Sequence, residues 1–430
     1  MNPDKILMKK QWIGILIVGM TLGTAWAVRG QFGHEQGAAW AGGIGALALV
    51  LVSKRRDWFS KMLTIALSSA VGWGAGGMIS YGIVVGYGRS THFPNALYGL
   101  LMLFVIGGLF GLLGGSLTGL TLESSDRKKV KWGRLIAEMA AGGVISYYLL
   151  IHQLEFLMTP PRSEGWAVCL GAGLAMLWYM ARDSYRSSLR VALITTLGAG
   201  FGFAFGNFLQ ILGNVLEISF NMWNVMEYSI GFFGGVSLAY GVFTSEWPEE
   251  SSAPEQWENR AALLLVFVFI PFIVFSQSLG YNKLLGKFSE TTNPETSALL
   301  SCLAAMLIIV SVAILACFRL KNAKHRFERR DVMLLSMAYF AAYITVSYIV
   351  TGALTGTFLL NHHLYWVNYI IIFLLVRKQY PAFFKDLSFD LNSKKYLLWF
   401  AGILIIIILL TLVSSSIHGE ISGSHNRFQV

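Results

Sequence analysis

Two glutamates occupy equivalent places in this sequence, and both are suited to acid–base chemistry. Glu35 is followed by six residues and then Gly42-Gly43, and Glu227 is followed by six residues and then Gly234-Gly235. If their carboxyl groups lay about 5 to 10 Å apart, they would supply the acid and the base or nucleophile of glycoside hydrolysis. His34, directly before Glu35, is a third candidate for proton transfer. The alternative is that each carboxylate is structural and is paired with a nearby arginine or helix N-terminus.

Polar and aromatic residues that could bind a substrate lie near these glutamates and at the ends of other apolar segments. Arginine binds carboxylate, sulfate or phosphate through paired hydrogen bonds, although contact with lipid headgroups is an equal alternative. Aromatic side chains cover the apolar faces of sugars, and amides bind hydroxyl groups. The candidate substrate-binding residues are Trp26, Arg29, Arg89, His92, Asn95, Asn207, Gln210, Asn214, Asn221, Trp223, Asn224, His362 and His363. This set favours a hydroxyl-rich small molecule, such as a sugar, a sugar acid or a glycoconjugate.

Metal and cofactor motifs are weak or missing. His34-Glu35 is the nearest approach to a metal motif, but neither H-x-x-x-H nor H-E-x-x-H occurs. Walker loops and serine nucleophile elbows are also missing, and Gly72-x-Gly74-x-Gly76-Gly77 lies in an apolar run, where it would serve helix packing. The three cysteines lack the spacing of metal ligands. We therefore expect no metal and no cofactor.

The composition predicts an all-α, polytopic membrane protein. Hydrophobic residues make up 55% of the 430 residues and charged residues only 13%, and the mean hydropathy is +0.58. The net charge of +10 is spread over short clusters between apolar runs, so we expect a lipid bilayer and not nucleic acid as the partner. Runs of about 20 apolar residues indicate about thirteen spans: 11–29, 37–53, 62–86, 96–121, 134–151, 165–181, 190–213, 222–244, 261–280, 297–318, 332–358, 363–376 and 396–416.

The distribution of basic residues predicts the orientation. With the N-terminus inside and the C-terminus outside, 27 of the 33 Lys and Arg residues face the cytoplasm. The candidate site would then face outward, toward the periplasm if this is a bacterial inner membrane protein. Lys9-Lys10, the run from Trp12 and Ala25-Trp26-Ala27 also resemble a signal peptide. We expect the first span to be retained, because the apolar sequence continues into a second span.

The glycine pattern divides the chain. Residues 1–245 are predicted to form four glycine-rich helical hairpins whose outer turns carry the candidate site residues, although the Gly-Gly pairs could recur by chance. Residues 246–259 form an acidic, solvated cytoplasmic linker. Residues 260–430 are poorer in glycine and are expected to form a five-helix supporting domain.

The polar groups gather on one side of the predicted membrane, which favours an enzyme over a transporter. A secondary transporter needs polar groups near the bilayer midplane and an exit on each side. We therefore expect a membrane-embedded hydrolase or transferase acting on a sugar or glycoconjugate. A lipid-linked substrate would explain a site within the membrane. The alternative is a secondary transporter of a polar or anionic solute. The oligomeric state is left open.

Overall fold

The structure of this chain is a computed structural model. The chain folds into helices. The structure describes residues 3–324, 326–351, 356, 359–378, 382–384 and 393–429, with side chains from residue 10 onward. The described residues form no β-strand longer than an isolated bridge. Ten of their helices are long and apolar enough to cross a membrane. The prediction of a helical, multi-pass membrane protein is therefore confirmed.

The first 245 residues contribute most of the buried hydrophobic residues of the core. Their helices are α1 (Pro3–Arg29), α2 (His34–Ser53), α3 (Arg56–Ser60), α4 (Met62–Gly76), α5 (Gly82–Gly88), α6 (Phe93–Glu123), α7 (Trp132–Tyr147), η1 (Tyr148–Gln153), α8 (Gly165–Arg182), α9 (Arg186–Val215) and α10 (Met222–Phe243). The later helices are α11 (Gln256–Leu263), η2 (Leu264–Phe269), α12 (Ile270–Val274), η3 (Phe275–Leu279), α13 (Tyr281–Lys287), α14 (Pro294–Asn322), α15 (Arg329–Thr351), α16 (Leu359–Arg377) and α17 (Ser393–Ser416).

Ten of the thirteen predicted spans coincide with the ten candidate membrane helices. The segments 165–181 and 222–244 are helical as α8 and α10 but fall outside that set. The predicted span 332–358 is described as a helix to Thr351, and its last residues lie mostly outside the described part of the chain.

The predicted span 62–86 is not one continuous helix, because it is interrupted at residues 77–81. The α4 helix ends at Gly76, residues 77–81 are not helical, and α5 begins at Gly82. A Cβ atom on Gly77 would lie 2.4 Å from the backbone oxygen of His34. The chain thus passes directly over the start of α2. Apolar composition alone does not distinguish a helix from such a break.

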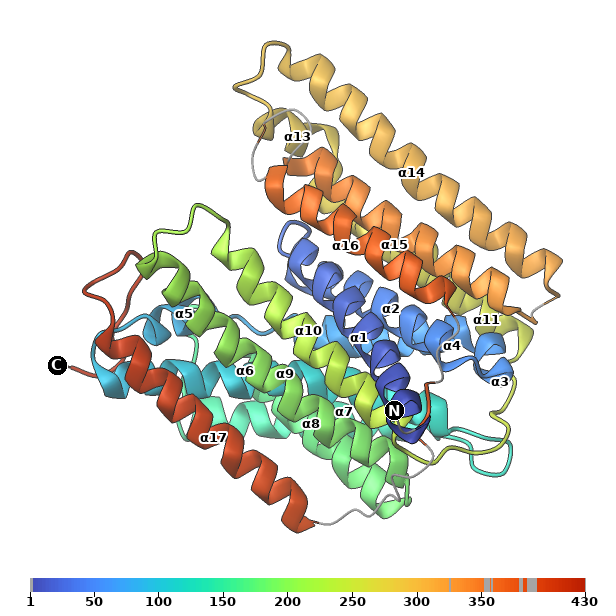
Figure 1. Cartoon of the computed structure of the whole chain (residues 1–430), viewed down its shortest axis with the longest axis horizontal. Helices are drawn as coiled ribbons and strands as arrows, with labels where there is room; N and C mark the ends of the chain where they lie inside the picture. The colour runs from blue at the N-terminus through green and yellow to red at the C-terminus, as the bar shows by residue number, and fades with distance from the viewer. Residues whose placement is uncertain are drawn as a thin grey trace.

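Six helices form a closed ring. Around it, α1 packs on α10, α10 on α9, α9 on α6, α6 on α4, α4 on α2, and α2 on α1 (Figure 1). Glycines permit the close approach: a Cβ on Gly72 would lie 2.5 Å from the Leu113 oxygen, and one on Gly111 would lie 2.2 Å from the Thr195 oxygen. The glycine-rich sequence therefore serves helix packing at these two positions.

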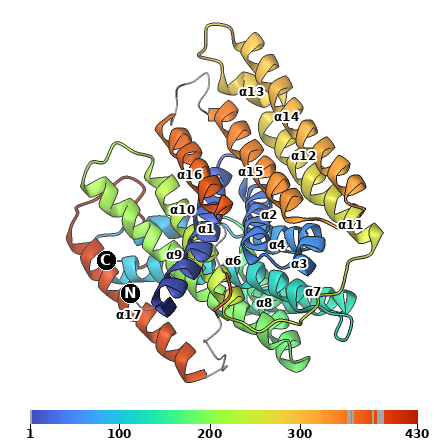
Figure 2. The ribbon, with the colours of Figure 1, turned by 45° about the vertical axis from the view of Figure 1, so that its right-hand side comes forward.

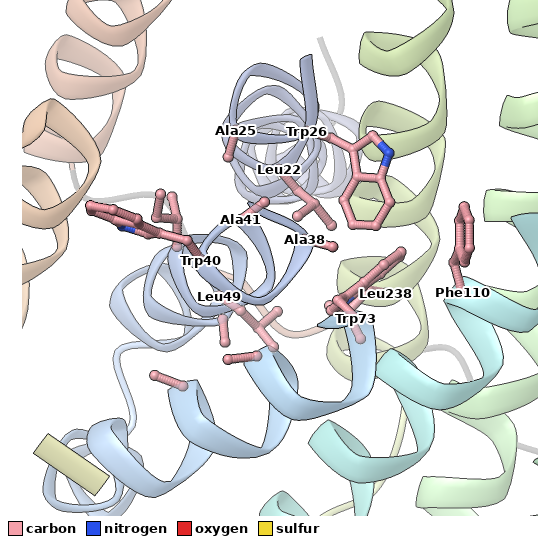
Figure 3. Packing of buried hydrophobic residues seen from close by; sticks show 14 of the residues in the cluster. Leu22, Ala25, Trp26, Ala38, Trp40, Ala41, Leu49, Trp73, Phe110 and Leu238 are labelled. Atoms are coloured by element: carbon pink, nitrogen blue, oxygen red, sulfur yellow. The ribbon is translucent and has the colours of Figure 1, made fainter. Parts of the chain in front are cut away.

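Aromatic side chains fill the interior of the six-helix ring. The centroids of the Trp26 and Trp73 side chains are 5.1 Å apart, and Phe110 lies 5.6 Å from Trp26. Phe203 continues the group at 6.1 Å from Phe110. All four side chains are buried, and Figure 3 shows Trp26, Trp73 and Phe110 converging from three helices. We call these four residues the aromatic plug.

The other helices surround this ring. In Figure 2 the pair α13 and α14 lies at the edge of the molecule, beside α12 and α15. The α17 helix returns to pack on α6 and α9. The acidic linker, residues 246–259, is mostly exposed or half-buried, and it contacts the segment around α3 at two points. Arg55 Nη2 donates to the Pro248 oxygen at 2.5 Å, and Lys61 Nζ donates to Ser251 Oγ at 2.8 Å. Burial lowers the pKa of Lys61 to about 8.

Candidate functional site

A cavity of about 1190 Å³ opens at the helix ends that the charge pattern assigns to the outside. Four segments contribute most of its lining: the α1–α2 turn, the break between α4 and α5, the loop before α8, and the start of α10. The lining residues are Gly30, Gln31, His34, Glu35, Gly77, Met78, Ile79, Ser80, Tyr81, Gly82, Ile83, Pro161, Arg162, Ser163, Asn221, Trp223, Asn224, Glu227, Lys287, Thr351 and His425. This volume is large enough for a small-molecule site.

Arg29, Glu227 and Tyr81 form a buried network at the cavity wall. Arg29 donates from Nε and Nη2 to Glu227 Oε2, at 3.3 and 3.2 Å. Arg29 Nη2 also donates to Tyr81 Oη at 2.7 Å, and the Tyr81 hydroxyl donates to Glu227 Oε1 at 2.5 Å. Both carboxylate oxygens are therefore occupied. Each partner is buried, but the Glu227 side chain keeps 7% of its surface exposed and lines the cavity.

Helix geometry favours the position of Arg29. Arg29 is the last residue of α1, where the helix dipole stabilises a cation. Glu227 is in the second turn of α10, beyond the reach of that helix's dipole, and it is held by Arg29 and Tyr81. The Arg29 guanidinium also lies 4.6 Å from the Trp26 side chain, part of the aromatic plug. Substituting one partner of this pair would leave the other as an unpaired buried charge.

His34 and Glu35 lie at the exposed rim of the cavity. Both begin α2, which places the Glu35 carboxylate in the first turn of that helix. The His34 side chain lies 5.3 Å from Tyr81, and its backbone oxygen accepts a hydrogen bond from Arg29 Nη1 at 3.1 Å. The three predicted catalytic residues therefore line one cavity.

A second polar group joins the cavity to α15 and α16. Gln31 Oε1 accepts hydrogen bonds from Ser347 Oγ at 3.1 Å and from Thr351 Oγ1 at 2.8 Å. The Thr351 hydroxyl lies 2.8 Å from His362 Nε2. His362 is fully buried and does not line the cavity, while the adjacent His363 is exposed.

The C-terminal residues 417–429 cover other predicted binding residues. Asn95 Oδ1 accepts hydrogen bonds from the backbone N–H groups of Arg427 and Phe428, each at 2.7 Å. Arg89 Nη1 donates to the Ser422 oxygen at 2.9 Å, and His92 lies beside Asn95. We call residues 417–429 the C-terminal strap. The strap adds His425 to the cavity lining.

The remaining predicted residues divide between the cavity and the protein interior. Asn221 accepts a hydrogen bond from the Trp223 N–H and so caps α10, and both residues line the cavity with Asn224. Trp26, Asn207 and Gln210 are buried away from the lining. Asn214 is exposed outside it.

Sequence reasoning missed Tyr81 and the loop 161–163. Tyr81 fell within a predicted span, and its short glycine-flanked segment, Gly76-Gly77 to Gly82, was the available signal for a break. The loop is held by Glu164, which accepts hydrogen bonds from the Met158 N–H and the Trp166 Nε1–H. Among the described residues, no three His, Cys, Asp or Glu side chains form a group that could hold a metal ion.

Comparisons with protein-family models, with curated proteins and with solved structures find no match for this chain. Its function must therefore be inferred from the cavity itself.

Proposed function

We propose that this protein is a membrane-embedded enzyme whose outward-facing cavity binds a sugar or glycoconjugate and cleaves or transfers a glycosidic bond. Glu227 supplies the charged carboxylate, as nucleophile or as electrostatic stabiliser. Glu35 or His34, at the cavity rim, supplies the proton for the leaving group. The observation that supports this proposal best is that Glu227 lines the cavity while Arg29 and Tyr81 hold both of its oxygens.

The surroundings of Glu227 suit the charge that develops in glycoside cleavage. The transition state resembles an oxocarbenium ion, which a fixed carboxylate stabilises. The salt bridge with Arg29 and the Tyr81 hydroxyl keep Glu227 oriented before substrate arrives. Glu35, in contrast, is exposed at the rim of the cavity. The two carboxylates thus differ in environment, as an acid and a nucleophile require.

A secondary transporter is the second candidate, because of the break between α4 and α5. Non-helical backbone at membrane depth is tolerated where it lines a cavity, and many transporters bind solutes at such discontinuous helices. Residues 77–81 line the cavity in this way. In an outward-open transporter, the aromatic plug within the six-helix ring would close the path from the cavity to the other side of the membrane.

Turnover by purified protein separates the two candidates. The protein in detergent would be incubated with a panel of 4-nitrophenyl glycosides, without any membrane gradient. We expect hydrolysis, and we expect Glu227→Gln and Glu35→Gln each to reduce kcat by about 10²- to 10⁴-fold. Glu290→Gln is the matched control, because Glu290 is exposed and lies outside the cavity lining.

The same protein in proteoliposomes would be offered radiolabelled sugars. Accumulation of unchanged sugar, together with no hydrolysis in detergent, would overturn the enzyme proposal in favour of transport. Wild-type turnover in both glutamine variants would remove these carboxylates from the mechanism.

A further inference from the structure

A second, mostly apolar groove of about 330 Å³ adjoins the cavity. Both α10 and α16 pack on α1 (Figure 1). The residues that line the groove come from these three helices and from Phe220. Ala27, Val225, Val367 and Ile371 are among its apolar lining residues. On α16, Val367 and Ile371 belong to a surface whose large hydrophobic side chains are exposed. This surface of a membrane protein faces lipid, so the groove is open to the bilayer.

The groove and the cavity meet at one hydrogen bond. Asn224 lines both, and its Nδ2 donates to the Tyr365 hydroxyl, which lines the groove. Glu227 lies about one helical turn along α10 from Asn224. The Asn224–Tyr365 contact therefore lies between the groove and the part of the cavity that Glu227 lines. The two spaces are therefore positioned for one elongated ligand.

The groove also contains buried polar groups. Asn361 lines it with only 2% of its surface exposed, and its side chain lies against the Tyr365 hydroxyl, which also accepts the hydrogen bond from Asn224. A ligand whose chain meets a polar head group would place that junction beside these side chains.

We propose that the groove binds the alkyl chain of a lipid-linked glycoside and that its sugar head group lies in the cavity. The reaction of that head group rests on the proposed function, whereas chain binding does not. An alkyl chain gains little by moving from lipid to an apolar groove, because the two surroundings are similar. Selectivity must then come from the head group in the cavity, and the groove serves to position it. The substrate class is an amphiphile, not a free sugar or a free hydrocarbon.

Photo-crosslinking in nanodiscs of dioleoylphosphatidylcholine tests this proposal without requiring turnover. Benzoylphenylalanine would replace Val225 or Leu364, which line the groove, or Leu307 on α14 as an exposed control. The probe is radiolabelled dodecyl β-glucoside. We expect adducts at 225 and 364 to saturate and to fall at least tenfold with excess unlabelled dodecyl β-glucoside, but not with dodecane. The yield of adducts at position 307 should rise linearly with the concentration of the probe.

Linear labelling at all three positions would overturn the proposal, as would a crosslink at 225 to a second copy of the chain. Saturable labelling without hydrolysis of any glycoside would support chain binding in the groove and would overturn the proposal that the protein is an enzyme. If hydrolysis is found, Val225→Trp should raise KM about tenfold for dodecyl β-glucoside and leave KM for methyl β-glucoside unchanged. An equal effect on both substrates would overturn the assignment of the groove to the chain.

Discussion

At the residue scale, the buried Arg29–Glu227 pair decides how the site is interpreted. The sequence indicated both residues separately, and one alternative paired each glutamate with an arginine. Their contact spans 198 positions in the chain, so no local pattern could have identified the partners. The role of Glu35 and Glu227 as an acid–base pair stays a prediction. Tyr81 joins the network only because the chain breaks near it, which apolar composition did not predict.

The first prediction concerns this pair. Arg29→Met and Glu227→Leu should each destabilise the protein by about 3–5 kcal/mol, because each leaves an unpaired buried charge. The double variant should be destabilised by less than the sum of the two, since it removes both charges. Unfolding of the purified protein in detergent measures all three. Additive losses would show that the two side chains are not coupled.

At the element scale, the break between α4 and α5 positions more of the cavity than any whole helix does. Apolar runs predicted where helices occur, because long uncharged segments favour spans. They did not predict the break, because glycine and apolar residues are compatible with both conformations. The structure shows that the two glycines beside the break differ in their surroundings. Gly77 lies against the start of α2, whereas Gly82 has no neighbouring atom within 4 Å of its Cβ position.

The second prediction uses these two glycines as a matched pair. Gly77→Ala should destabilise the protein by about 1–3 kcal/mol, because its Cβ would displace the backbone at His34. Gly82→Ala should be neutral or stabilise the protein by up to about 1 kcal/mol, because alanine loses less conformational entropy in a helix. Thermal unfolding in detergent gives both values. Equal shifts in Tm would contradict the close contact at Gly77.

The third prediction concerns the C-terminal strap. Asn95→Ala removes the acceptor for the Arg427 and Phe428 N–H groups. Exchange of the amides in residues 417–429 should accelerate roughly 5- to 150-fold, the factor expected for losing about 1–3 kcal/mol. Hydrogen–deuterium exchange with mass spectrometry measures it, and Asn214→Ala, on an exposed residue, is the control. Unchanged exchange in Asn95→Ala would show that other contacts fix the strap.

At the scale of the whole molecule, the sequence offers a prediction of the orientation but none of the helix arrangement. Basic residues are counted loop by loop, so their bias is available without a structure. Closure of the six-helix ring depends on contacts between helices far apart in the sequence, such as α1 with α10 and α6 with α9. The recurring Gly-Gly pairs predicted close packing but not which helices would meet.

The fourth prediction tests the orientation. In a variant without native cysteines, Ser163→Cys and Ser219→Cys should react with an impermeant thiol reagent in spheroplasts, because both sites are exposed at the predicted outer surface. Asp126→Cys, exposed at the predicted inner surface, should react only after permeabilisation. Reaction at Asp126→Cys alone would reverse the orientation and place the cavity in the cytoplasm.

The aromatic plug has an electrical consequence. A cavity filled with water lies near the potential of the compartment to which it opens, so the membrane voltage falls across the protein beneath it. The insulating layer is then thinner than the bilayer, and the local field is correspondingly stronger. Moving one charge across 100 mV is worth about 2.3 kcal/mol. Arg29 and Glu227 lie beside the plug but cancel each other's charge. The pair would therefore respond little to voltage, whereas a charged substrate at the same depth would respond.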